Sequence, residues 1–217
     1  MVPITIRALK PQGPGSYVKA VTLVIDENPA PLAAVFTLGK DAGVAMLSTR
    51  VRVNSYSHIR AIAELSDGSL YMVKRFVKAS GGCSAPAGKD AIAARTAMGK
   101  MKLRQYGLAK SATSDQSPLH EAQVMIRHPN NSGLQTDQLT GYNIPAHFVQ
   151  SIRISQAARL VIDVEGAISL SENPAIRFRF RQNSDEKLSV KAIDTDQNVF
   201  AASWDVKAGK NDAATTN

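Results

Sequence analysis

The single cysteine, Cys83, is the residue with the clearest chemistry in this sequence. It lies in "SGGCSAPAGKD", preceded by Gly81 and Gly82 and followed by Ser84 and Gly88. A buried cysteine packs among apolar side chains, and these neighbours offer none. The glycines give the backbone freedom and a thin profile, which suits a thiol that must enter the cleft of another protein. We therefore expect an exposed, reactive thiol on a flexible arm made of these four neighbours.

Other chemical roles for Cys83 have less support in the sequence. A catalytic cysteine needs a histidine base within hydrogen-bond reach, and a flexible arm holds such geometry poorly. Met98 and Met101 with His120 or His128 could imitate a soft copper site, but methionines in such surroundings are more often packing residues. No glycine-rich phosphate loop follows a strand and opens a helix. We expect no catalytic residue, no metal and no cofactor.

The composition is that of a globular protein with a basic surplus. The chain has 217 residues, 44% of them hydrophobic, and carries 26 Lys and Arg against 18 Asp and Glu, a formal charge of +8. The basic residues are spread over many segments without a recognised nucleic-acid motif, so we expect no nucleic acid partner. One cysteine excludes an intramolecular disulfide framework. No apolar run approaches the roughly 20 residues that span a bilayer.

Period-two alternation indicates that strands must position this thiol. In "AMLSTRVRV" the residues Val51 and Val53 fall on one face, and Arg50 and Arg52 fall on the other. The Asp-Gly pair at 67–68 predicts a hairpin turn, because both residues tolerate positive φ. Six or seven short strands without a helix before residue 79 favour a β-sandwich.

The alternation stops at the cysteine segment and then returns. Asp90 as N-cap and Gly99 past the C-terminus predict a short helix. Segments such as "AIRFRFR" then predict a second sandwich of similar size. The predicted organisation is a first domain at 1–79, a flexible cysteine-bearing linker with the short helix at 80–99, a second domain at 100–207 and a disordered tail at 208–217.

Two further features lie outside this strand pattern. The connection "RHPNNSGLQTDQLTGYNIPAHFV" is about 20 residues long, and loops of that length are functional, disordered or, here, a wide crossover between sheets. The tetrapeptide Glu-Asn-Pro-Ala occurs at 27–30 and again at 172–175. Each copy is adequately explained as a turn before a strand.

Both halves of the sequence resemble known sulfur-oxidation proteins. "VPITIRALKPQGPGSYVKAVTLVIDENPAPLAAVFTL" and "STRVRVNSYSHIRAIAELSDGSLYMVKRFVKASGGC" resemble SoxY, the sulfur-carrier subunit of bacterial thiosulfate oxidation. "IRHPNNSGLQTDQLTGYNIPAHFVQSIRI" and "SENPAIRFRFRQNSDEKLSVKAIDTD" resemble SoxZ, its partner. The order in one chain is similar to that of the fused SoxYZ-like carriers found near quinoprotein dehydrogenases.

The resemblance implies an all-β protein of two immunoglobulin-like sandwiches, packed as an internal pseudo-heterodimer in the periplasm after removal of a signal peptide. It implies that Cys83 covalently holds a sulfur-containing intermediate. Partner enzymes, of the Sox type or quinoprotein dehydrogenases, would load and unload the thiol. The protein would then be a carrier and not an enzyme.

One departure from SoxY leaves alternatives open. In SoxY the motif resembles GGCGG and ends the chain, whereas here the chain runs on into the second domain. A loop anchored at both ends reaches only about 15 Å as a doubled chain. Two other functions therefore stay open. One is a scaffold for a quinoprotein dehydrogenase, with the cysteine incidental, and the other is a redox dimer through a Cys83–Cys83 disulfide.

Overall fold

The computed structural model describes residues 1–9, 16–42, 46–85, 96–108, 119–182 and 187–206, which form an almost entirely β structure. The first half contributes β1 (Val2–Arg7), β2 (Val18–Ile25), β3 (Leu32–Leu38), β4 (Met46–Val51), β5 (Ser57–Leu65) and β6 (Leu70–Val77). The second half contributes β7 (Met101–Leu108), β8 (Leu119–Ile126), β9 (Val149–Gln156), β10 (Arg159–Gly166), β11 (Ala175–Arg181), β12 (Leu188–Asp194) and β13 (Val199–Trp204). A short 3₁₀ helix, η1 (Lys40–Ala42), lies between β3 and β4.

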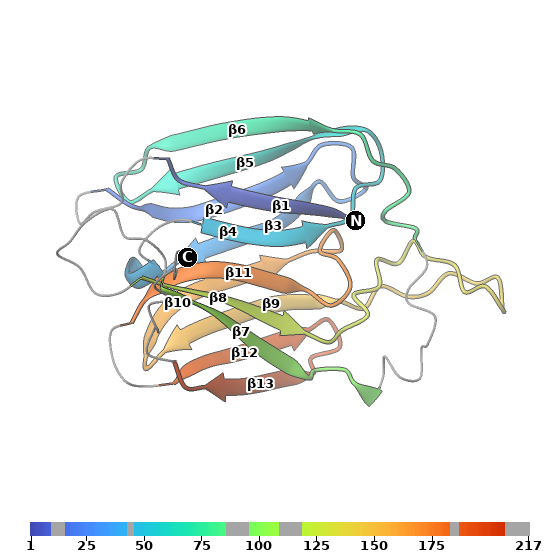
Figure 1. Cartoon of the computed structure of the whole chain (residues 1–217). Helices are drawn as coiled ribbons and strands as arrows, with labels where there is room; N and C mark the ends of the chain where they lie inside the picture. The colour runs from blue at the N-terminus through green and yellow to red at the C-terminus, as the bar shows by residue number, and fades with distance from the viewer. Residues whose placement is uncertain (10–15, 43–45, 86–95, 109–118, 183–186, 207–217) are drawn as a thin grey trace, which may run out of the picture.

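The strands form two antiparallel sheets (Figure 1). One has the order β1-β4-β11-β8-β7 and the other the order β13-β12-β9-β10-β3-β2-β5-β6. In the first sheet β11 pairs with β4, and in the second β10 pairs with β3. Both sheets therefore continue from one half of the chain into the other. The predicted all-β, immunoglobulin-like sandwich fold is confirmed, with the two sandwiches joined edge to edge.

Strand alternation places the core between the sheets. In β11, Phe178 and Phe180 are 0% and 1% exposed, whereas Arg177 and Arg179 on the opposite face are only half-buried. These phenylalanines share one buried cluster with Phe36 of β3, so residues of both halves build the same core. Burying one such side chain contributes about 1.5–3 kcal/mol. The core therefore holds the two halves together independently of the connecting segment.

The predicted hairpin at 67–68 is confirmed between β5 and β6. Gly68 adopts φ +84°, and the Asp67 carboxylate accepts a hydrogen bond from the Ser69 amide at 2.8 Å. The turn sends β6 back along β5 to Val77, at the end of the sandwich where the cysteine segment begins. The hairpin thus places the end of β6 next to the segment that contains Cys83.

The predicted short helix at 90–99 is not confirmed. Residues 86–95 lie outside the described part of the chain, and residues 97–99 form a turn that ends at Gly99 with φ +78° and leads into β7. The predicted tail at 208–217 also lies outside the described residues. Among the described helices, none has the length and apolar character to cross a bilayer.

Candidate functional site

Cys83 lies in a tight turn that follows β6 and packs against the backbone just after β4. The Gly81 amide donates to the Asn54 carbonyl at 2.8 Å, and the Gly82 amide donates to the Val53 carbonyl at 3.0 Å. A Cβ on Gly82 would lie 2.7 Å from the Val53 carbonyl oxygen, too close for any side chain. Position 82 therefore needs glycine to let the turn lie against its neighbour.

The predicted exposure of the thiol is wrong in this conformation, because Cys83 is 0% exposed. Gly81 and Ser84 are exposed and Gly82 is buried, while Gly88 lies outside the described residues. The expectation considered only the small neighbours in the sequence, whereas the turn is also held by hydrogen bonds to Val53, Asn54 and Ser132, which are distant in the sequence. The role of these four residues as a flexible arm stays a prediction.

The long loop between β8 and β9 holds the thiol turn from the second half. The Ser132 hydroxyl donates a hydrogen bond to the Cys83 carbonyl, and the Gln135 side-chain amide donates to the Ala85 carbonyl at 3.2 Å. The Gln135 side-chain oxygen in turn accepts from the Ser132 amide at 2.8 Å. Both side chains are buried. This loop thus binds the backbone of the cysteine turn at two carbonyls.

A buried arginine lies beside the same turn. Arg52 is 2% exposed; its Nη1 donates to the Gly82 carbonyl at 3.3 Å and its Nη2 donates to the Asn130 carbonyl at 3.1 Å. The guanidinium therefore joins the thiol turn to the second half. Strand alternation had placed Arg52 on the polar face with Arg50. This prediction is wrong because β4 ends at Val51, so the strand alternation no longer sets the direction of the Arg52 side chain. The Arg52 amide donates to the Ser169 carbonyl, outside the strand pairing.

The two copies of Glu-Asn-Pro-Ala brace this region through their asparagines. The Asn28 side chain donates to the Arg52 carbonyl and accepts from the Asn54 amide, both at 2.8 Å. The Asn173 amide donates to the His128 carbonyl at 2.8 Å, and the Asn173 side-chain oxygen accepts from the His128 amide at 3.3 Å. The repeated tetrapeptide marks the positions of these two asparagines in the sequence. Its interpretation as a turn did not predict their hydrogen bonds.

Two electrostatic effects act in opposite directions on the pKa of the Cys83 thiol. Burial raises the pKa of the Cys83 thiol, and the positive charge of Arg52 acts in the other direction. Burial also lowers the pKa of the Arg52 guanidinium, which nevertheless stays protonated as arginines do in proteins. The described conformation therefore places a neutral thiol close to a buried cation.

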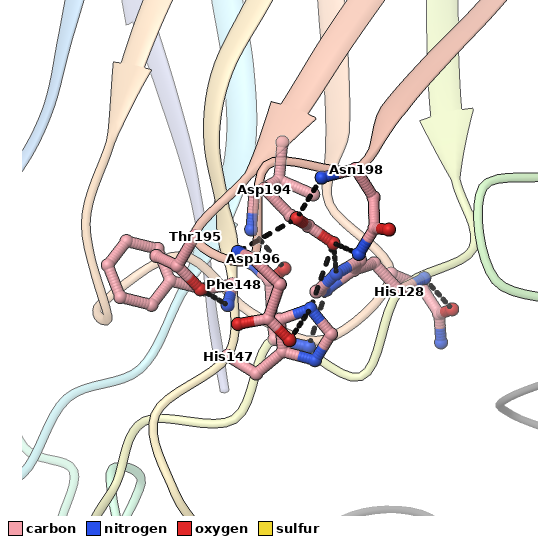
Figure 2. A network of polar contacts seen from close by, with 10 residues as sticks. His128, His147, Phe148, Asp194, Thr195, Asp196 and Asn198 are labelled. Atoms are coloured by element: carbon pink, nitrogen blue, oxygen red, sulfur yellow. Dashed lines mark hydrogen bonds and ion pairs between the residues drawn. The ribbon is translucent and has the colours of Figure 1, made fainter.

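Two histidines and a carboxylate form a polar network that adjoins Asn130 (Figure 2). His128 Nε2 lies 3.3 Å and His147 Nε2 lies 2.8 Å from Asp194 Oδ2. Asn198 adds bonds to Asp194 from its backbone amide at 2.9 Å and its side chain at 3.0 Å. Burial opposes ionisation of Asp194, but the bonds from Asn198 and both histidines outweigh it and lower its pKa to about 2.

This network has the ligand types of a metal centre, since its three side-chain ligand atoms lie within 4.8 Å of one another. The Asn130 amide, however, donates to His128 Nδ1 at 3.0 Å. The neutral ring then carries its proton on Nε2 and donates it to Asp194. A metal-bound histidine donates from its other ring nitrogen, which the Asn130 amide prevents here. The geometry favours a hydrogen-bonded network that fixes Asn130, whose carbonyl binds Arg52.

The other two histidines lie in separate surroundings. His58 packs on Phe76, with ring centroids 5.1 Å apart, and His120 packs on Phe180 at 5.5 Å. Within the described ranges no hydrogen bond joins any histidine to Cys83. The arrangement of a histidine-activated nucleophile is therefore not assembled in the described part of the protein.

The fold and site define a two-part β-sandwich protein with one thiol enclosed at the junction of its halves. Residues 1–83 match the family described as "Sulfur oxidation protein SoxY", and residues 109–205 match "Sulphur oxidation protein SoxZ". The chain is a fused SoxYZ-like protein, with a carrier or partner role in sulfur oxidation. The comparison with curated proteins gave no match.

Proposed function

We propose that this protein is a periplasmic covalent carrier that holds a sulfur-containing intermediate on Cys83 while partner enzymes transform it. The observation that supports this most is that the SoxY match ends on residue 83, the only cysteine of the chain. A thiolate forms a disulfide-type bond with an oxidised sulfur donor, which makes a single thiol sufficient for covalent carriage. Turnover then belongs to the partners that load and unload it.

The buried thiol adds a step to this function. A partner reaches Cys83 only after the turn leaves the loop that covers it, which breaks the bonds from Ser132 to Cys83 and from Gln135 to Ala85. Each neutral hydrogen bond contributes about 1 kcal/mol net, so the closed state is favoured only modestly. The closed state protects the thiol from oxidation between encounters with partners, because thiol oxidation requires access.

Intact mass spectrometry of the protein purified from its native host without reductant tests the carrier function. The expected result is a reducible adduct that maps to Cys83 and is missing in the Cys83→Ser variant. The mass of the adduct identifies the carried group. A bare thiol in protein from the native host, which also stays bare with thiosulfate or polysulfide and native extract, would contradict the proposal.

A scaffold for a quinoprotein dehydrogenase is the second candidate function, and the complete burial of Cys83 favours it. A scaffold needs no accessible thiol. Its partner binding would survive Cys83→Ser, which a pull-down of the dehydrogenase with wild type and variant measures. Loss of binding in the variant would count against the scaffold and for a cysteine-dependent encounter.

A further inference from the structure

Arg52 is a fully buried cation without a carboxylate beside it. Within the described part of the chain, no aspartate or glutamate lies at ion-pair distance from its guanidinium. Its Nε is buried and has no hydrogen-bond partner. Burying an ion costs several kcal/mol, so buried charges in proteins are normally paired. The position therefore calls for an anionic partner.

The guanidinium is directed at the cysteine turn. Two of its nitrogens are fixed on the carbonyls of Gly82, which directly precedes Cys83, and of Asn130. These carbonyls satisfy donors but supply no negative charge. The negative charges that act on Arg52 are those of Glu172 and of Cys83 when it ionises. Of these, only Cys83 lies in the turn that the guanidinium already holds.

We propose that Arg52 is an anion-binding residue of the carrier site, which binds the negative charge of the Cys83 thiolate and of a singly charged sulfur anion carried on that thiol. The inference rests on the proposed carrier function and adds a residue of this chain that binds the carried group. A neutral cargo would leave Arg52 with no negative charge in the cysteine turn, and only Glu172 would act on it.

The shape of the guanidinium suits this task better than an ammonium group would. Arginine presents its donors in a rigid planar fork, and charge-assisted hydrogen bonds are about twice as strong as neutral ones. Here the fork has two nitrogens on backbone carbonyls and an unpaired Nε. The carbonyl bonds orient the fork, and the Nε–H stays available to an anion.

Two small adducts of opposite character test the proposal on purified protein. Tetrathionate converts the thiolate to Cys83 Sγ–S–SO₃⁻: Sγ attacks one of the two inner sulfurs, the central S–S bond of tetrathionate breaks, and thiosulfate leaves. Methyl methanethiosulfonate converts it to the neutral Cys83–S–CH₃ disulfide and releases methanesulfinate. Thermal unfolding of the two adducts then compares an anionic cargo with a neutral one.

In the wild type we expect the anionic adduct to unfold at a higher temperature than the neutral one. Arg52→Met should abolish this difference, and Arg52→Lys should keep part of it. Arg50→Met is the matched control, because Arg50 is exposed and, among the described residues, its guanidinium hydrogen-bonds to the Asn173 carbonyl alone, at 3.4 Å. The control should behave as the wild type. Equal unfolding temperatures of the two wild-type adducts would overturn the proposal even if no Arg52 variant folds.

Ultraviolet titration of the thiolate, with Cys83→Ser as the baseline, gives a second measurement. We expect Arg52→Met to raise the titration midpoint of Cys83 by about one pH unit, which is a tenfold loss of thiolate at neutral pH. An unchanged midpoint would contradict the role of Arg52. If a native adduct is found but Arg52→Met changes neither measurement, the carrier function stands and the anion site does not.

Discussion

The Ser132 hydroxyl donates a hydrogen bond to the carbonyl of Cys83, which lies 49 positions earlier in the chain. The bond joins the SoxZ-like half to the thiol turn that ends the SoxY-like half. The second half therefore does more than extend the sheets. It binds the thiol turn, so that residues of both halves hold the site.

Removing this bond should make the thiol more reactive. Ser132→Ala leaves the Cys83 carbonyl without its partner, a loss of about 1 kcal/mol from the closed state. We expect alkylation of Cys83 by iodoacetamide to become about fivefold faster, as followed by intact mass spectrometry. Ser84→Ala is the control, because its exposed hydroxyl donates to the Gly81 carbonyl, at 3.4 Å, and to no other group in the described part of the chain. Equal rates in both variants would mean that Ser132 does not restrain the turn.

A methyl group at position 82 should open the turn more strongly. Gly82→Ala places a Cβ 2.7 Å from the Val53 carbonyl oxygen, and backbone cannot move aside cheaply there. We expect Cys83 in this variant to react with thiol reagents at more than tenfold the wild-type rate while the strand content by circular dichroism is kept. Gly141→Ala is a control for a glycine substitution without a steric clash: no atom lies within 4 Å of the added Cβ, although its φ of +72° also strains an alanine. A wild-type rate in Gly82→Ala would show that the closed turn is not the resting state.

The buried carboxylate of Asp194 should make stability depend on acid pH. Its pKa is lowered to about 2 in the folded protein, against about 3.9 in an unfolded chain. The unfolded state therefore binds more protons between these values, and the stabilisation is complete above about pH 5 and lost as the pH falls through about 2. The contribution at neutral pH is about 2.5 kcal/mol.

Denaturant unfolding of wild type and Asp194→Asn between pH 6 and pH 2 measures this contribution. The variant should be less stable at neutral pH by about 2 kcal/mol, and the difference should shrink below pH 4. A difference that stays constant over the whole range would assign the effect to packing instead of charge.

The two halves should stay together when the chain between them is cut. β3 pairs with β10 over five residue positions, and β4 pairs with β11, so both sheets cross the junction. We expect a protein cleaved at a protease site inserted between Ala85 and Thr96 to elute from gel filtration at the size of the intact protein. It should also unfold in one calorimetric transition. Separation of the fragments in native buffer would show that the linker is needed to hold them.

Local patterns in the sequence were sufficient for the strands and the class of fold. Alternation in "AIRFRFR" predicted the inward Phe178 and Phe180 correctly, because side chains of a strand point to opposite faces by geometry alone. The Asp-Gly pair at 67–68 predicted its hairpin for a similarly local reason. The short helix at 90–99 was not confirmed, and a capping pattern without tertiary packing specifies a helix only weakly.

The sequence by itself determined the all-β character, the lone thiol between two glycines and serine, and the likeness of each half to a sulfur-oxidation family. Only the tertiary structure decided that Cys83 is enclosed, that Arg52 turns inward, and that Ser132 and Gln135 bind the carbonyls of Cys83 and Ala85. The reason is the range of the interactions involved. Strand and turn preferences act over a few residues. The hydrogen bonds from Ser132 and Gln135 join positions about 50 residues apart, and no local pattern encodes which distant loop binds the cysteine turn.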